Sequence, residues 1–299
     1  MLHIWSTAQY TFPLPDGHRF PAEKYEMMRR RVLEAGIVDL ANLHDPSRAT
    51  RGDLLRVHTE RYVDAVADGN LTAAEQRAVG LPWSPALAER SLRATGATCE
   101  AAHHALDAGV AMSLAGGTHH AFADHGEGFC VFNDVVVAIR KLQAEKRIAR
   151  AAVIDLDVHQ GNGTHALVAD DPSVYAFSMH GRKNYPFRKV PGTLDIELED
   201  GTGDDEYLSV LGTALPRVLA DANADIVFYL AGSDTHEGDR LGRMKLTFAG
   251  LARRDVMVLE SCRDVGIPVV STVAGGYGKD IRDSVEVHVN TARICREFV

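Results

Sequence analysis

The chain has 299 residues, 45% hydrophobic and 24% charged, with a formal net charge of −9. It is long enough to bury a large core, and its acidic balance without a Lys/Arg block excludes direct DNA binding and would suit a cationic substrate. Four cysteines without a CxxC pair, no signal-like leader and no run of about 18 apolar residues predict a cytoplasmic protein without a membrane span.

The first 95 residues are mixed in pattern. Helical spacing predicts helices over 23–35 and 59–67. Prolines mark loops near 13–21 and 82–85. We find no internal repeat, low-complexity tract or linker in the chain.

From about residue 96, apolar runs alternate with helical patterns. The predicted strands are 110–114, 151–156, 174–179, 226–231 and 268–273. The predicted helices are 133–145, 204–219, 251–265 and 280–296. Apolar strands that alternate with amphipathic helices are typical of a parallel sheet covered on both faces. We therefore predict one α/β domain over residues 1–299, with a central parallel sheet flanked by helices.

Polar side chains follow nearly every one of these strands. The strand ends read GGTHH, DLDVHQGNG, SMH, GSDTHEGD and GGYG. Because the carboxyl ends of parallel strands share one edge of the sheet, ligands bind there in such folds. The functional site is therefore expected at this edge.

A metal site is indicated by the run from Asp155 to His159. Asp155, Asp157 and His159 alternate, so in an extended chain they point the same way. Two buried carboxylates are costly unless a cation offsets them. Asp234, at another strand end, would complete a set with Asp157 and His159 that leaves one position open for water, as in catalytic zinc sites. The alternative is a strand end with solvated polar residues.

Two adjacent histidines, His119 and His120, follow another strand end. They could flank one bound water, with a neutral imidazole as general base and its partner supplying electrostatic stabilisation. Asp155 and Asn162 are candidates for orienting the two rings. The alternative is a pair of surface histidines without a shared role.

Tyr277 lies between glycines in the segment GGYG. Gly275 and Gly276 let the backbone bend tightly and approach a ligand. A tyrosine hydroxyl placed there can donate to a developing oxyanion. The alternative is a loop with a packed tyrosine.

Taken together, these motifs resemble the histone deacetylase family over essentially the whole chain. The matching segments are RVHTERYVDAV at 56–66, GGTHHAF at 116–122, GFCVFND at 128–134, VIDLDVHQGNG at 153–163, SMH at 178–180, DGTGDDEYL at 200–208, AGSDTHEGDRLG at 231–242 and GGYG at 275–278. The resemblance implies an arginase–deacetylase fold. It also implies zinc, with ferrous iron as the alternative metal, held by Asp157, His159 and Asp234.

The resemblance further implies roles for individual residues. His120 would be the general base, His119 its electrostatic partner paired with Asp155, and Tyr277 the group that polarises the amide carbonyl. A structural potassium ion would be held by Asp155, Asp157, His159, Ser178 and Met179. The substrate tunnel would be lined by Gly128, Phe129, Leu241, Gly275 and Gly276. Tyr185 or Phe187 would supply a second aromatic wall.

Three departures from the family pattern stand out. Asn162 occupies a position where many members have Asp, and the HQGNG form looks most like the class IV branch and its bacterial relatives. The stretch 79–84 holds no acid that could match the rim carboxylate of class I enzymes. In the segment 18–25, Lys24 would replace an arginine of the inner channel.

The predicted activity is metal-dependent hydrolysis of an Nε-acyl-lysine, acetyl or longer, in a protein or peptide. Leu241 favours this substrate, because a carboxylate at that tunnel position would favour a polyamine. The alternatives are an acetylpolyamine or other small-molecule deacetylase, and, from another class, a non-catalytic binding module. An arginase-like dimanganese enzyme shares the fold, but ligands for only one metal are evident.

Overall fold

Eight parallel strands form one sheet in the order β2-β1-β3-β8-β7-β4-β5-β6 in the computed structural model, which describes residues 1–299. The strands are β1 (Ile4–Trp5), β2 (Leu43–His44), β3 (Val110–Ser113), β4 (Ala151–Asp155), β5 (Val174–Gly181), β6 (Leu194–Leu198), β7 (Ile226–Ala231) and β8 (Val269–Val273). The helices are α1 (Lys24–Glu34), α2 (Arg51–Leu54), α3 (Glu60–Asp68), α4 (Ala73–Val79), α5 (Pro85–Ala108), α6 (Asp134–Ala144), α7 (Asn162–Val168), α8 (Asp204–Ala222), α9 (Phe248–Asp264) and α10 (Ile281–Arg296), with a short 3-10 turn at Leu40–Asn42. The predicted single α/β domain with a parallel sheet is confirmed.

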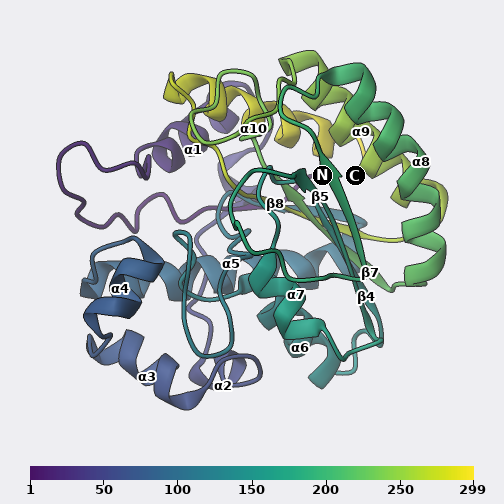
Figure 1. Cartoon of the computed structure of the whole chain (residues 1–299). Helices are drawn as coiled ribbons and strands as arrows, with labels where there is room; N and C mark the ends of the chain where they lie inside the picture. The colour runs from purple at the N-terminus through teal and green to yellow at the C-terminus, as the bar shows by residue number, and fades with distance from the viewer.

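Helices cover both faces of the sheet. Figure 1 shows α1, α8, α9 and α10 on one side and α2 to α7 on the other. Strand β7 contributes side chains to the apolar core on each face of the sheet. Val227 and Tyr229 belong to one core, and Ile226 and Phe228 belong to the other. Both faces of the strand are thus buried, which is why these strands read as continuous apolar runs rather than alternating ones.

The sequence pattern does not predict β1, β2, β6, α2, α4, α5 or α7, and for four of these elements the reason is identifiable. Strands β1 and β2 have two residues each, too few to show any periodicity. Strand β6 lies at the edge of the sheet and is mostly half-buried. Helix α5 has 24 residues and begins at Pro85, in the stretch expected to be a loop. Proline is tolerated at the first helical position, and the Ser84 side chain caps the helix by accepting from the Leu87 N–H.

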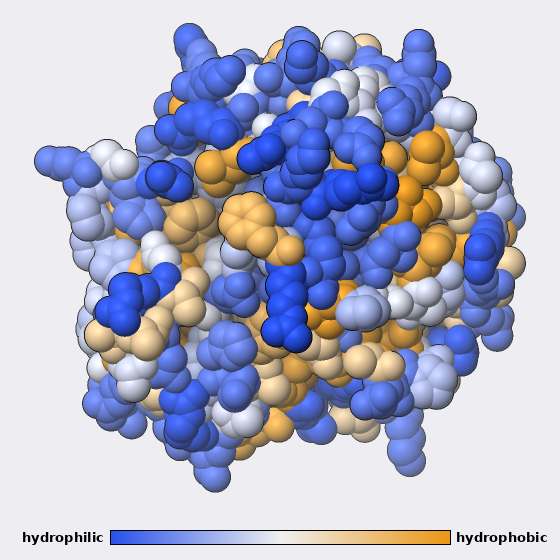
Figure 2. Space-filling view, viewed as in Figure 1, coloured by the Kyte–Doolittle hydropathy of each residue, from blue (hydrophilic) through white to orange (hydrophobic).

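The outer surface and the interior differ in where charge lies. Hydrophilic side chains cover much of the face seen in Figure 2, with apolar patches between them. Inside, carboxylates that are at most 1% exposed gather at the carboxyl edge of the sheet, among them Asp155, Asp157 and Asp234. No helix is both long enough and apolar enough to cross a bilayer.

Candidate active site

Five neighbouring strands deliver the candidate residues to one edge. In sheet order β3-β8-β7-β4-β5, the loops that follow the strands carry the functional side chains. They contribute, in that order, His119 with His120, Tyr277, Asp234, Asp157 with His159, and Tyr185. Residues up to 158 positions apart in sequence, from His119 to Tyr277, thereby become neighbours.

The structure brings the three predicted metal ligands together. One donor atom from each of Asp157, His159 and Asp234 lies within 4.8 Å of the others. His159 Nδ1 is 2.9 Å from Asp157 Oδ1 and 3.2 Å from Asp234 Oδ2. All three side chains are buried. One imidazole nitrogen with two carboxylates is a donor set that suits a catalytic divalent metal and leaves a position open.

The partners of these carboxylates fit a cation at their centre. Asp234 Oδ1 accepts from the Val158 N–H at 2.9 Å, whereas Asp234 Oδ2 is buried with no hydrogen-bond partner. Burial and the adjacent Asp157 raise the pKa of Asp234 to about 7. Burial opposes a charge on His159, but both carboxylates outweigh it and raise the pKa of His159 to about 10. The two carboxylates therefore favour a positive charge between them, and a divalent cation would supply it.

Gly275 allows the loop after β8 to pass directly beside these ligands. Its N–H donates to Asp157 Oδ2 at 2.6 Å. A Cβ atom at this position would lie 1.8 Å from Asp234 Oδ2 and 2.7 Å from Asp157 Oδ2. Only glycine fits, so Gly275 shapes the ligand cage, while the Gly276 carbonyl faces Lys24.

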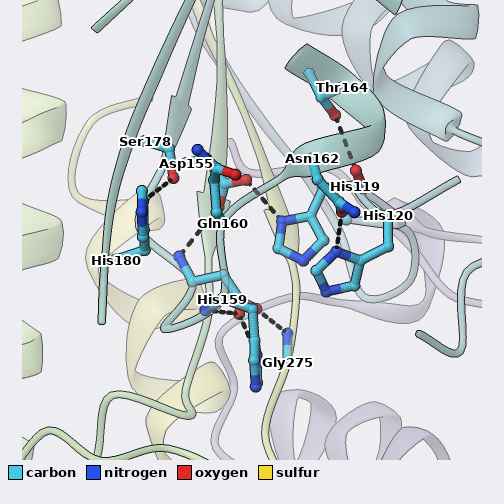
Figure 3. Close-up of polar contacts among 12 residues, drawn as sticks. His119, His120, Asp155, His159, Gln160, Asn162, Thr164, Ser178, His180 and Gly275 are labelled. Atoms are coloured by element: carbon cyan, nitrogen blue, oxygen red, sulfur yellow. Dashed lines mark hydrogen bonds and ion pairs between the residues drawn. The ribbon is translucent and has the colours of Figure 1, made fainter. Parts of the chain in front are cut away.

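His119 and His120 lie side by side with different partners, as Figure 3 shows. Their ring centroids are 4.1 Å apart. His119 Nδ1 donates to Asp155 Oδ2 at 2.6 Å, and His120 Nδ1 donates to Asn162 Oδ1 at 2.6 Å. Both Nδ1 atoms are thus engaged, which leaves each Nε2 for the cavity.

The two partners give the histidines opposite electrostatics. Burial opposes a charge on His119, but Asp155 and Asp157 outweigh it and raise the pKa of His119 to about 9. Burial, together with the charges on His119 and His159, lowers the pKa of His120 well below 6.5. The amide of Asn162 cannot reverse this as a carboxylate would. At neutral pH the pair is therefore one imidazolium and one neutral imidazole.

Tyr277 is placed by a carboxylate that holds two loops together. Asp239 Oδ2 accepts from the Tyr277 N–H at 2.6 Å, and Asp239 Oδ1 accepts from the N–H groups of Leu241 and Gly242. The phenol ring lines the same cavities as His120 and His159. Its hydroxyl makes no hydrogen bond to another residue, so it is a free donor at the site.

An outer cavity of about 360 Å³ leads to these residues. Phe129 forms one wall beside Tyr277, with ring centroids 5.8 Å apart. The Tyr185 ring lies 5.0 Å from that of His120 and forms the second wall, whereas Phe187 is 86% exposed at the rim. Gly128 and Leu241 also line the cavity. A Cβ at Gly128 would meet His120 at 2.7 Å, so glycine is required there.

A smaller inner cavity of about 80 Å³ continues past the metal ligands. Lys24 lines it, as expected, and Nζ faces the carbonyls of Gly276 and Ala274 at 3.3 and 3.4 Å. Arg90 lines it too, with its guanidinium 4.0 Å from the centre of the Tyr25 ring. Arg90 escaped the sequence analysis, because nothing marks one arginine within a helix.

Two of the potassium ligands expected from the family resemblance lie side by side on neighbouring strands. Asp155 and Ser178 are register partners on β4 and β5, and Met179 follows. Ser178 Oγ lies 2.9 Å from His180 Nδ1. The carbonyls of Asp157 and His159 accept none of the loop hydrogen bonds of the chain. Oxygen atoms are the ligands that such a hard cation takes, and they are present here.

Asp134 was not singled out from the sequence. Its carboxylate accepts from the N–H groups of Gly117 and Thr118 and from the Thr118 hydroxyl. It thereby fixes the loop that presents His119 and His120. Such a residue could have been found only by asking which group satisfies the donors of that loop.

The fold and the site together indicate a hydrolytic enzyme with a candidate metal site at the edge of a parallel sheet, and comparisons with known proteins identify the family. Residues 18–292 match the histone deacetylase domain. An uncharacterized protein of Picosynechococcus is 43% identical over 288 residues, 96% of each chain. Histone deacetylase 2 of Arabidopsis thaliana is 33% identical over 282 residues, 90% of this chain and 73% of that protein. The crystal structure of a histone deacetylase homologue from Aquifex aeolicus has the same fold, with a TM-score of 0.87 at 23% identity over 99% of this chain and 84% of that one.

The chain belongs to the histone deacetylase family and is a hydrolytic deacetylase. This family is generally metal-dependent, in agreement with the Asp-His-Asp group found here.

Proposed function

We propose that the chain hydrolyses the amide of an Nε-acyl-lysine, acetyl or longer, to free lysine and a carboxylate. The observation that carries this proposal is the convergence on one cavity of a three-residue metal site, a neutral histidine and a free tyrosine hydroxyl. These are the parts that metal-assisted amide hydrolysis needs.

Zinc is the metal we propose for Asp157, His159 and Asp234, with ferrous iron as the alternative. When bound, it would supply Lewis acidity to the carbonyl and lower the pKa of an attacking water. Two carboxylates would neutralise the dication and weaken both effects. The chain must therefore contribute a base and an oxyanion donor of its own. A potassium ion near Asp155 and Ser178 is part of the same proposal.

His120 takes the proton of the attacking water at Nε2, because its Nδ1 is held by Asn162. Water oxygen adds to the amide carbon while Tyr277 donates a hydrogen bond to the carbonyl oxygen. His119, held as an imidazolium by Asp155, stabilises the negative charge. The C–N bond then breaks as His120 returns its proton to the leaving nitrogen. The products are a free amine and a carboxylic acid, which then loses its proton to water and becomes the carboxylate.

The shape of the cavities supports a lysine side chain as the substrate. An extended alkyl chain would lie between Phe129 and Tyr185. Leu241 at the rim offers no carboxylate to a second amine, which disfavours polyamines. The inner cavity of about 80 Å³ would take an acetyl group more readily than a long acyl chain.

The test is turnover by the purified, zinc-loaded protein on acetyl-, octanoyl- and myristoyl-lysine peptides beside acetylputrescine and acetylspermidine. Each is assayed with and without a hydroxamate inhibitor, and again after loading with ferrous iron. We expect hydroxamate-sensitive release from the lysine peptides. Release from the polyamines alone would contradict the proposed substrate. If no substrate were hydrolysed although metal was bound, the result would favour either an amide substrate outside this panel or a non-catalytic binding module.

A further inference from the structure

The mouth of the site carries a local charge opposite to that of the whole chain. Twelve residues line the outer cavity; Arg19, Lys183 and Arg243 are among them, and none is an Asp or Glu. All three cations are exposed. The chain as a whole has 41 acidic and 32 basic residues, so a lining with three basic and no acidic residues differs from the overall composition.

The three cations reach the mouth from three separate loops. Arg19 precedes α1, Lys183 lies between β5 and β6, and Arg243 lies between β7 and α9. The same cavity is lined by His120, His159 and Tyr277. A substrate must therefore pass these charges on its way to the metal ligands.

Few acidic side chains of the protein neutralise these three cations. Asp200 is shared between Arg243 at 3.2 Å and Lys183 at 3.8 Å. Arg19 has no ion pair or hydrogen bond through its side chain. One carboxylate against three cations leaves a net positive mouth. Charges that line a cleft concentrate the potential there and attract ligands of the opposite sign.

The loop that carries Lys183 adds an apolar contact. Phe187, 86% exposed, lies on this loop and also lines the mouth. Its ring meets that of Tyr185 edge-on at 6.3 Å. An exposed aromatic ring among cations offers a polypeptide both a flat surface and partners for its acidic side chains.

We propose that this mouth selects acyl-lysines flanked by Asp or Glu residues in a polypeptide, an inference that rests on the proposed deacylase function. Lysine-rich segments and polyamines are disfavoured, since their remaining ammonium groups would approach Arg19, Lys183 and Arg243. The negative charge on the substrate would mainly speed association. The effect must then weaken with salt, because the screening length is about 8 Å at physiological ionic strength.

The test compares three acetyl-lysine peptides that differ only in having Glu, Gln or Lys at the flanking positions. At low salt we expect kcat/KM to fall in that order, by roughly tenfold from the Glu to the Lys peptide, and the ratio to shrink in about 0.5 M salt. The triple variant Arg19→Glu, Lys183→Glu, Arg243→Glu should invert the order. Arg217→Glu, a single charge reversal of the same kind at a 70% exposed position on α8, should leave it unchanged.

The same peptides with a hydroxamate in place of the acetyl-lysine amide give a second readout. Tighter binding of the Glu-flanked hydroxamate, lost in the triple variant, would support the mouth inference even if no acetyl peptide were hydrolysed, and the deacylase proposal would then fail alone. Equal kcat/KM and equal affinity for all three flanks would overturn the inference, whether or not turnover is seen. So would an unchanged order in the triple variant.

Discussion

The floor of the site, where the candidate metal ligands lie, and its mouth, the lining of the outer cavity, hold charge in different ways. On the floor, Asp155, Asp157 and Asp234 are buried, and nearly every oxygen has a partner fixed by the backbone or by a histidine. At the mouth, three cations stand in solvent on three loops, and only Lys183 and Arg243 have a carboxylate nearby, which they share. A buried charge cannot be screened or replaced by water, whereas an exposed one can. Changes on the floor should therefore affect the chemical step, and changes at the mouth should affect substrate choice.

The largest effect is expected for Asp234→Asn on the floor. The change keeps the shape and removes one of the two charges that would hold the proposed metal. Loss of metal would forfeit several kcal/mol of transition-state stabilisation, roughly a 10³-fold fall in kcat/KM. Metal content and the zinc-induced rise in Tm measure it, since a ligand that binds only the folded state raises stability. Asp264→Asn, at an exposed position on α9, is the control. Full metal content in Asp234→Asn would contradict the ligand assignment.

Tyr277→Phe separates the two contributions that the floor makes to the reaction, metal binding and a hydrogen bond to the oxyanion. It removes only the hydroxyl, which has no partner in the protein, so packing and metal binding should persist. Loss of one oxyanion donor lowers kcat by about 10² to 10³-fold. Tyr175→Phe on β5, away from the site, serves as the control. Activity near that of the wild type would show that the phenol has no such role.

Asn162→Asp should change the pH profile more than the maximal rate. A carboxylate beside His120 favours the imidazolium, so it would raise the pKa of that histidine. Because the base must be neutral, the acidic limb of kcat/KM should move to higher pH, and activity at low pH should fall. An unshifted limb would mean that His120 is not the group that titrates in the reaction. The same limb measured for Asn223→Asp, the same substitution at an exposed position at the end of α8, gives the reference.

The sequence predicts the floor much better than the mouth. Asp157, His159 and Asp234 follow apolar strands, and a parallel sheet must bring such ends together. Asp239 was not foreseen, because its role is to accept from Tyr277 across two loops. Helix α5 was missed because its start looks like a proline loop. Loop positions have no periodicity, so the overall charge of −9 suggested a cationic substrate, while the mouth has the opposite sign.

Asp200→Asn should have the smallest effect, because it changes the charge of the mouth without replacing any of its three cations. Removing the one shared carboxylate frees Arg243 and Lys183 for the substrate. An exposed ion pair is worth about 0.2–1 kcal/mol, so the preference for Glu-flanked over Lys-flanked peptides should rise by roughly 1.4- to fivefold at low salt. The matched control is Asp221→Asn, which removes an exposed charge paired with Arg217 on α8. Equal ratios in the two variants would show that the mouth's charge does not reach the substrate. If kcat changed while the ratio of kcat/KM between the Glu- and Lys-flanked peptides did not, the mouth would affect the chemical step rather than substrate choice. The distinction drawn here between floor and mouth would then be wrong.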